Sequence, residues 1–152
     1  RRGERGKPQR VEYNLLEADL ARPKVKEADF RGKAKHVEYR ERAHQPAMLC
    51  TLVMTRNVDA TGVARFPVGT LPVIDPGTGE TLVDALGRRS FTTSIAYGPS
   101  IGRNIALAYL PRDYCEKGRE LAVRYFGETY PVEVVGIGYE PLYDPENAKP
   151  RS

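Results

Sequence analysis

The distribution of apolar residues divides the chain near Pro46. Beyond this proline, apolar and β-branched residues come in short runs of strand length, separated by turns that contain Gly or Pro. About six such strands, with no strand–helix–strand rhythm, predict a mainly β fold. We expect an antiparallel six-stranded barrel, jelly-roll-like, preceded by a short helical segment. The predicted strands fall within residues 47–54, 71–74, 81–84, 90–96, 104–110, 120–126 and 129–135.

Two pairs of these runs have the spacing of β-hairpins. Residues 75–79 contain Asp-Pro-Gly, which favours a turn, so 71–74 can pair with 81–84. Apolar and polar residues alternate along 120–126, and Gly127-Glu128 is the expected two-residue link to the last strand. Pro131 has no N–H group to donate, so it predicts that this strand lies at an edge or beside a bulge.

The residues before Pro46 predict a single helix. Asp29 is the expected N-cap, and Phe30 and Val37 are spaced to form one buried stripe. The helix should end before Pro46, because the residue that precedes a proline avoids the helical conformation. We therefore divide the chain into a flexible basic leader, a helical lead-in and a C-terminal β-barrel, with the bounds 1–14, 15–46 and 47–148.

The net charge of +4 is concentrated at the start of the chain. Residues 1–42 hold 13 Lys and Arg against 8 Asp and Glu, so they carry +5 and the remainder carries −1. A nearly neutral barrel is unlike a nucleic-acid groove, so nucleic acid is not an expected partner. The basic leader alone keeps an RNA-binding barrel open as an alternative.

A few further features bear on the cellular compartment of the protein and on whether the chain is part of a longer one. Cys50 and Cys115 are far apart in sequence, and we expect two buried or half-buried thiols in a reducing cytoplasm. The longest apolar run, 47–54, is shorter than the roughly 20 residues that cross a bilayer. The first residue is Arg1 rather than Met, so we expect a subunit, or a processed or excised piece, of something longer.

The residue pattern does not predict a self-contained catalytic set or a metal site. His36 and His44 have no partner at a metal-binding spacing, which favours structural or solvent-facing roles. The segment 97–103 contains glycines, but it also contains a proline. It lacks the strand, glycine-rich turn and helix that form a dinucleotide-binding loop, so a barrel corner is favoured. Tyr143 lies in a proline-bounded tail and is the tyrosine most expected to leave the barrel wall.

Several stretches carry a resemblance to a known family. They include Asp29-Phe30-Arg31-Gly32-Lys33 in the lead-in, and the full set is 16–20, 26–33, 93–111, 123–131 and 140–147. In this order they resemble the C-terminal end of the glycine cleavage T-protein (aminomethyltransferase) superfamily. The resemblance is closest to the flavin-dependent dimethylglycine and sarcosine dehydrogenases and oxidases. It covers about residues 15–148. The chain departs from the family above all in its length, and residues 84–91 also stand where a shorter link is expected.

The resemblance implies a part in N-demethylation linked to one-carbon transfer. In such enzymes a flavin (FAD) domain oxidises an N-methyl amine, and a T-protein-like half passes the one-carbon unit to tetrahydrofolate. The lead-in would be the end of the folate-binding region, and the barrel would close one wall of the folate pocket. The catalytic aspartate and most of the folate site would precede this sequence, so the chain is not expected to be catalytic alone.

The resemblance also suggests folate contacts and a partner. Tyr143 is the first candidate for contact with folate, followed by Tyr97 and by Arg103, which could pair with the glutamate tail. The partner would be the rest of the enzyme or a separate large subunit, packed on the predicted helix. Two alternatives stay open: part of a flavin-free tetrahydrofolate-dependent demethylase or aminomethyltransferase, and a stand-alone protein- or RNA-binding barrel.

Overall fold

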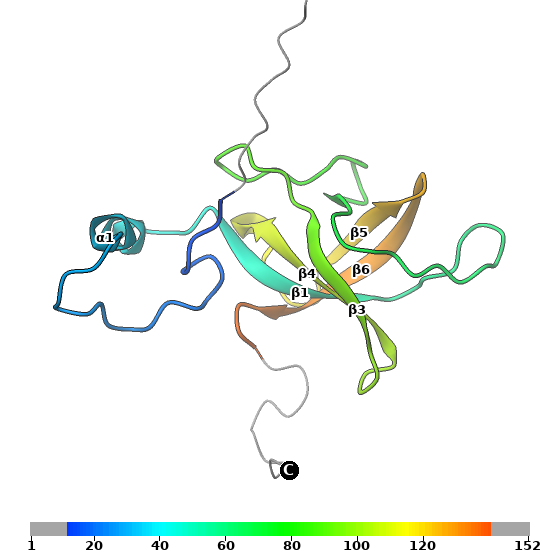
Figure 1. Ribbon diagram of the computed structural model, residues 1–152. Helices are drawn as coiled ribbons and strands as arrows, with labels where there is room; N and C mark the ends of the chain where they lie inside the picture. Colours follow the sequence, from blue (N-terminus) through cyan, green and yellow to red (C-terminus); the bar gives the residue numbers. More distant parts are fainter. Residues whose placement is uncertain (1–11, 141–152) are drawn as a thin grey trace, which may run out of the picture.

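The computed structural model describes residues 12–140. The mainly β fold is confirmed: six antiparallel strands form a half-barrel, and one short helix precedes them in the described part of the chain (Figure 1). The elements are α1 (Lys33–Glu41), β1 (Ala47–Met54), β2 (Val73–Ile74), β3 (Thr92–Gly98), β4 (Arg103–Pro111), the 3₁₀ helix η1 (Arg112–Tyr114), β5 (Glu120–Tyr125) and β6 (Glu128–Ile137).

The sheet has the strand order β2-β5-β6-β1-β4-β3. Its two outer strands meet through backbone hydrogen bonds, because Thr92 N donates to Leu71 O at 2.8 Å and Val73 N donates to Ser90 O at 3.1 Å. These bonds join the start of β3 to the segment that enters β2. The strong curvature of the sheet brings one side of β1, β4, β5 and β6 around a common interior (Figure 1).

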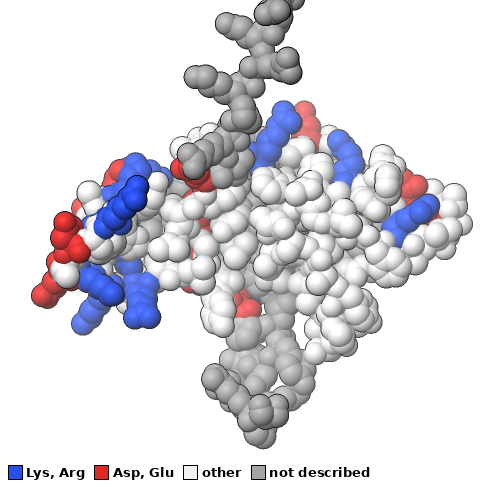
Figure 2. Space-filling view, in the orientation of Figure 1, with Lys and Arg blue, Asp and Glu red and all other residues white. Residues whose placement is uncertain are grey.

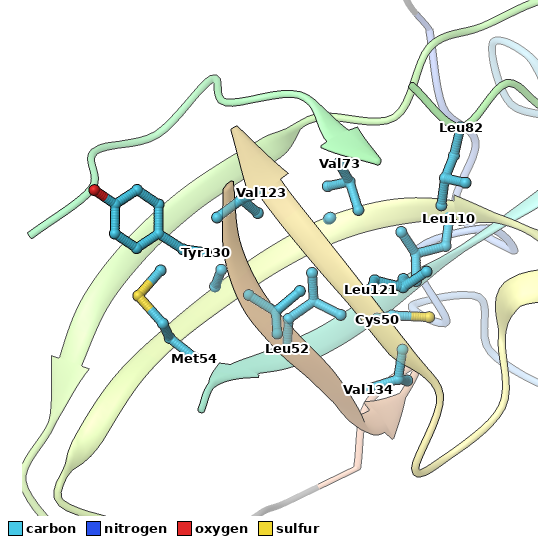
Figure 3. Packing of buried hydrophobic residues seen from close by; sticks show 13 residues of the cluster. Cys50, Leu52, Met54, Val73, Leu82, Leu110, Leu121, Val123, Tyr130 and Val134 are labelled. Atoms are coloured by element: carbon cyan, nitrogen blue, oxygen red, sulfur yellow. The ribbon is translucent and has the colours of Figure 1, made fainter. Parts of the chain in front are cut away.

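Alternation along the strands fills that interior with apolar side chains. On β4 the even-numbered residues from 104 to 110 are buried, while the odd-numbered residues from 103 to 109 are half-buried or exposed. Figure 3 shows the resulting cluster, in which Leu52, Leu121 and Val134 come from three different strands and are almost fully buried. Burial of such side chains is the main favourable term for the fold.

The two predicted hairpins form, with one change in the last of them. Ile74 bridges Thr81 across the first turn, and Asp75 N donates to Glu80 O at 3.0 Å. In the last hairpin Tyr125 pairs with Glu128, so the link is Phe126–Gly127, one residue earlier than predicted. Both link residues have positive φ, 48° and 81°, which is the backbone of a type I′ turn.

Pro131 was predicted to place its strand at an edge or beside a bulge; the edge position is wrong for β6, whereas a register shift is present in its pairing with β1. This strand pairs with both β5 and β1, and the register shift in the β1 pairing lies near Thr51 and Leu52, away from Pro131. The proline is tolerated because β1 ends its ladder at Met54, which pairs with Val132. Pro131 therefore has a ladder partner only on the β5 side, and its carbonyl accepts from Thr55 N at 3.1 Å.

The helix is shorter than predicted and begins later. Gly32, not Asp29, occupies the N-cap position, with φ of 89°, and it has no side chain with which to cap the helix. Phe30 precedes the helix and is 40% exposed, and each residue of α1 is half-buried or exposed. The predicted buried stripe is therefore wrong. In residues 12–140, no helix is long and apolar enough to cross a bilayer.

The segment before α1 packs on the barrel instead. Leu49 N of β1 donates to Glu17 O at 2.7 Å, and Tyr139 N donates to the Asp19 carboxylate at 2.9 Å. Gly138 N in turn donates to Leu49 O at 2.7 Å. Residues 13–19 thus lie against β1 and the end of β6.

Gly138 allows this close approach, and its replacement should be costly. A Cβ at this position would lie 2.7 Å from Cβ and Cγ of Asp19, and the backbone has φ of 66°. Gly127 also has positive φ (81°) but has open space around it, so Gly127→Ala is the matched control. We expect Gly138→Ala to lower the free energy of unfolding by about 1–3 kcal/mol more than the control, because only it adds a clash. Equal losses in urea titrations of the two variants would contradict the crowding at Asp19.

Candidate functional site

A buried charged cluster joins the lead-in to the barrel. Arg88 Nε donates to Asp84 Oδ2 at 2.6 Å, and both terminal nitrogens of the guanidinium donate to the carboxylate of Glu17. Arg88 Nη1 also donates to Glu12 O at 2.6 Å. The side chains of Arg88, Glu17 and Asp84 are 9%, 2% and 2% exposed. We call these three residues the Arg88 cluster.

A tight turn places Arg88 in this position. Asp84 Oδ1 accepts from Leu86 N at 2.9 Å and from Arg88 N at 3.0 Å, so one carboxylate both closes the turn and pairs with the guanidinium. Gly87 has φ of 75°, which suits the turn. This is the segment 84–91 that the resemblance marked as longer than expected. The turn in this segment holds Arg88 in its buried position.

Two tyrosines cover the cluster. The rings of Tyr13 and Tyr109 stack with centroids 3.7 Å apart and an interplanar angle of 5°. The Arg88 guanidinium carbon lies 4.4 Å from the centroid of Tyr13, a cation–π geometry. Burial raises the pKa of Tyr13 to about 12, so its phenol is neutral at ordinary pH. The cluster pairs its cation with two carboxylates and fastens the lead-in to the outer face of β4.

The raised pKa of Tyr13 predicts a loss of stability in alkali. The unfolded phenol releases its proton near pH 10 and the folded one near pH 12, so the folded state binds more protons between these values. Stability contributed by Tyr13 is therefore complete below pH 10 and is lost as pH rises from 10 to 12. We expect Tyr13→Phe to have a shallower decline over this range in urea midpoints measured at each pH. An unchanged slope would contradict the buried environment of Tyr13.

A second feature is an apolar hollow between the lead-in and α1. It measures about 580 Å³ and is open to solvent, and we call it the lead-in hollow. Arg40 of α1 joins the two sides, since its Nη1 donates to Pro23 O of the lead-in at 3.2 Å, and its Nε donates to His36 Nε2 within the helix at 3.0 Å. The residues that line it are Leu15, Leu20, Ala21, Arg22, Lys24, Val25, Lys26, Phe30, Arg31, Gly32, His36 and Arg40.

The lead-in hollow combines apolar walls with a basic rim. Leu20 and Phe30, two large apolar side chains that line the hollow, are 61% and 40% exposed. Figure 2 shows charged side chains gathered over the region of α1, while the adjoining face of the barrel carries few. An apolar segment with acidic neighbours would suit this surface.

The residues predicted to contact folate do not gather in one place. Tyr97 pairs with Asn104, and Arg103 pairs with Gly98, at the end of the β3–β4 hairpin. Directly paired residues point to the same face of a sheet and successive residues point to opposite faces, so Tyr97 and Arg103 lie on opposite faces. Tyr97 is 58% exposed, and Arg103 is also exposed. Tyr143 lies outside the described residues.

The structure also shows the surroundings of His36 and of the two cysteines. His36 accepts a hydrogen bond from Arg40, which is a structural role. Within residues 12–140, His, Cys, Asp and Glu side chains do not gather in the groups of three that could hold a metal ion. Cys50 is buried and Cys115 is half-buried, both as free thiols, as predicted. The sequence analysis did not predict the Arg88 cluster. The spacing of Asp84 and Arg88, four positions apart with Gly87 between them, could have indicated a turn closed by an ion pair.

Comparison with known proteins agrees with the fold. The family model described as the glycine cleavage T-protein C-terminal barrel domain matches residues 70–144. The crystal structure of glycine cleavage system aminomethyltransferase T from Bartonella henselae superposes with a TM-score of 0.50 and 18% identity. That alignment covers 69% of this chain and 25% of the other chain, and at this identity it supports the fold alone.

Two curated relatives carry the sequence similarity. An aminomethyltransferase of Saccharopolyspora erythraea is 40% identical over 65 residues, which is 42% of this chain and 18% of the relative. The mitochondrial dimethylglycine dehydrogenase of Rattus norvegicus is 29% identical over 126 residues, which is 83% of this chain and 12% of the relative. The chain thus spans less than a fifth of each relative's length.

The fold, the family match and these relatives define the class: a C-terminal barrel domain. Residues 70–144 match the glycine cleavage T-protein C-terminal barrel domain, and the chain is similar to an aminomethyltransferase and to a dimethylglycine dehydrogenase. The resemblance drawn from the sequence is confirmed.

Proposed function

We propose that this chain is the C-terminal barrel module, or small subunit, of a folate-linked, flavin-dependent enzyme that demethylates N-methyl amines. The observation that carries the proposal is the extent of similarity to dimethylglycine dehydrogenase. It covers 83% of the chain, more than the 75 residues of the barrel-domain match, so it includes residues outside that domain. The lead-in and the barrel are then one part of the same larger enzyme.

The role of the barrel would be structural. In the assembled enzyme, tetrahydrofolate supplies the acceptor for the one-carbon unit and FAD supplies the oxidising power, and both are held largely outside this chain. The chain's own residues suit one wall of a folate pocket, because an exposed tyrosine ring can stack on a flat heterocycle and a guanidinium can pair with a carboxylate. Since Tyr97 and Arg103 face opposite ways, a ligand lying against one face of the hairpin would contact only one of them.

The lead-in hollow would be the contact with the rest of the enzyme. Most of the length of the relatives lies outside the part matched by this chain, and the apolar side chains of the hollow are exposed. An apolar segment of the partner region would cover Leu20 and Phe30, and acidic residues beside it would meet Arg22, Lys24 and Arg31. This agrees with the expectation that the helical lead-in packs on a missing partner.

A flavin-free aminomethyltransferase is the second candidate. It is favoured by the higher identity, 40%, to the aminomethyltransferase of Saccharopolyspora erythraea, although that match covers only 42% of this chain. In this case the barrel and the lead-in hollow would have the same structural roles. Only the partner region would differ, because it would lack FAD.

The test is the native mass and visible absorption spectrum of the protein isolated from its source. A large particle with a flavin spectrum is expected. A large colourless particle that requires tetrahydrofolate would support the second candidate instead. A colourless particle with the mass of one or two copies of the chain would overturn both, and would favour a stand-alone binding barrel.

Tyr97 provides a test of the folate wall within the assembled enzyme. If its ring lies against the bound folate, Tyr97→Ala should weaken tetrahydrofolate binding about 3- to 10-fold, because an aromatic stack contributes about 0.5–1.5 kcal/mol. Phe126→Ala is the matched control, since Phe126 is a highly exposed aromatic residue on another hairpin. Binding can be measured by calorimetry. Equal dissociation constants for the two variants would remove Tyr97 from the pocket.

A further inference from the structure

The end of β6 brings the chain back to the lead-in hollow. Tyr139 N donates to the Asp19 carboxylate at 2.9 Å, although the two residues are 120 positions apart in the sequence. Leu20, the residue after Asp19, lines the hollow. Figure 1 shows the end of β6 beside the lead-in. Residues that follow Glu140 therefore start next to the apolar walls of the hollow.

The rim of the hollow carries cations without partners. Its lining, as far as the structure describes the chain, contains Lys and Arg side chains but no carboxylate. Arg40 is used within the lead-in and α1. Four other cations make no ion pair with any residue of 12–140, namely Arg22, Lys24, Lys26 and Arg31. Exposed apolar walls beside unpaired cations suit an occupant that is both apolar and acidic.

Residues 141–147 have this chemistry. Their sequence is Pro-Leu-Tyr-Asp-Pro-Glu-Asn, so two large apolar side chains are followed by two carboxylates, with no Lys or Arg among them. An extended chain advances about 3.5 Å per residue, so Leu142 and Tyr143 can reach roughly 7–10 Å from Glu140. Residues 1–11 are unsuited to the site, because they hold five Lys and Arg against one Glu and so have the same sign of charge as the rim.

We propose that residues 141–147 dock in the lead-in hollow of their own chain. The side chains of Leu142 and Tyr143 lie against Leu20 and Phe30, which removes exposed apolar surface from water on both sides. Because the segment is joined directly to Glu140, its effective concentration at the hollow is on the order of millimolar, and individually weak contacts hold it there. A separate molecule lacks this advantage.

The two carboxylates of the segment complete the contact. Asp144 and Glu146 pair with the cations of the rim, of which Lys24 and Lys26 carry amines that a chemical probe can reach. The inference goes beyond the proposed function, in which the partner region covers the hollow. In the free chain the segment covers this surface, and the partner region displaces it on assembly. Tyr143 becomes available to folate only after that exchange.

Zero-length cross-linking of the full chain tests the contact. A carbodiimide joins a carboxylate to an amine without adding a spacer, so it links groups that are already in contact. The expected product is a monomer in which Asp144 or Glu146 is linked to Lys24 or Lys26, identified by digestion and mass spectrometry. The pair Lys117–Glu140 is the internal control, because its atoms are 2.9 Å apart and its side chains are exposed.

A double variant separates the apolar anchors from the charges. Leu142→Ser combined with Tyr143→Ser keeps every charged group, and we expect it to lose the links to Lys24 and Lys26 while the link between Lys117 and Glu140 remains. Tyr139→Ser is the matched control, since it removes an aromatic ring that is 80% exposed and outside the segment. This control should retain both kinds of link.

Three results would overturn the proposal. The first is the absence of links from the segment to Lys24 and Lys26 in a chain that forms the control link. The second is a link only between two chains, which would make a second copy the occupant. The third is an undiminished yield of the links in the double variant. All three are measured on the isolated chain, so they are independent of the native mass and flavin spectrum that test the proposed function.

Discussion

Arg88→Met is expected to lower the free energy of unfolding by about 3–5 kcal/mol. Methionine can fill much of the space of the arginine side chain, but it cannot pair with a carboxylate. Glu17 and Asp84 would then be left in the protein interior, each 2% exposed, without their shared cation. Removing one partner from a buried ion pair is far more costly than removing a partner at the surface, because the remaining charge loses both water and its counter-ion.

Arg89→Met is the matched control for this substitution. Arg89 is the next residue in the chain and is exposed, so its replacement removes the same charge and changes the same side-chain volume. We expect its free energy of unfolding to stay within about 0.5 kcal/mol of the starting protein. The two variants are compared by urea unfolding at neutral pH. A similar small loss for both would show that the Arg88 cluster is not a buried ion network.

A double-mutant cycle separates the Glu17 pairing from loss of packing. Glu17→Gln removes the negative charge and keeps the shape of the side chain. When it is combined with Arg88→Met, the interior holds one unpaired carboxylate, Asp84, instead of two. The combined loss should therefore be smaller than the sum of the single losses, by about 1–3 kcal/mol. Simple additivity would contradict direct coupling between Glu17 and Arg88.

Deletion of the lead-in segment should have an effect of similar size. A chain that begins at residue 21 lacks Glu17, the Tyr13 ring that stacks on Tyr109, and the acceptors for Leu49 N and Tyr139 N. We expect it to lose about 3–5 kcal/mol of the free energy of unfolding relative to a chain that begins at residue 12. Thermal and urea unfolding of the two chains provide the measurement.

A third chain, which begins at residue 47, tests the predicted division between the lead-in and the barrel. The bounds 15–46 and 47–148 separate the lead-in from the barrel, but the contacts of residues 13–19 with β1, β4 and the 84–88 turn cross that boundary. If a chain that begins at residue 47 is as stable as one that begins at residue 12, the lead-in is an independent segment. If it is much less stable, the folding unit includes the lead-in.

Local patterns predicted the elements that depend on neighbouring residues. The Asp75-Pro76-Gly77 turn, the alternation along 120–126 and the apolar run 47–54 each specify a backbone conformation within a few residues. These signals led to the six-stranded antiparallel fold and to both hairpins. Two errors at this level were small shifts, because the last link moved by one residue and α1 began after Gly32. Two were larger: α1 has no buried stripe, and β6 is not an edge strand.

The sequence stretches that match the family, in their order along the chain, predicted the family. They did not predict the directions in which surface side chains point. The stretches around 93–111 and 123–131 resembled the T-protein barrel and also suggested Tyr97 and Arg103 as folate contacts. A residue's direction depends on strand register, which a motif does not contain. The pairing of Tyr97 with Asn104 and of Arg103 with Gly98 places the two side chains on opposite faces.

Contacts between distant segments were beyond the reach of sequence patterns. Glu17 and Arg88 are 71 positions apart, so no local periodicity relates them. Their meeting depends on how β1 and β4 pair and on how the lead-in folds back against that pair. The sequence contained the chemistry of this cluster, an arginine and two carboxylates. Burial and proximity, which give that chemistry its strength, arise only when the sheet closes around its core.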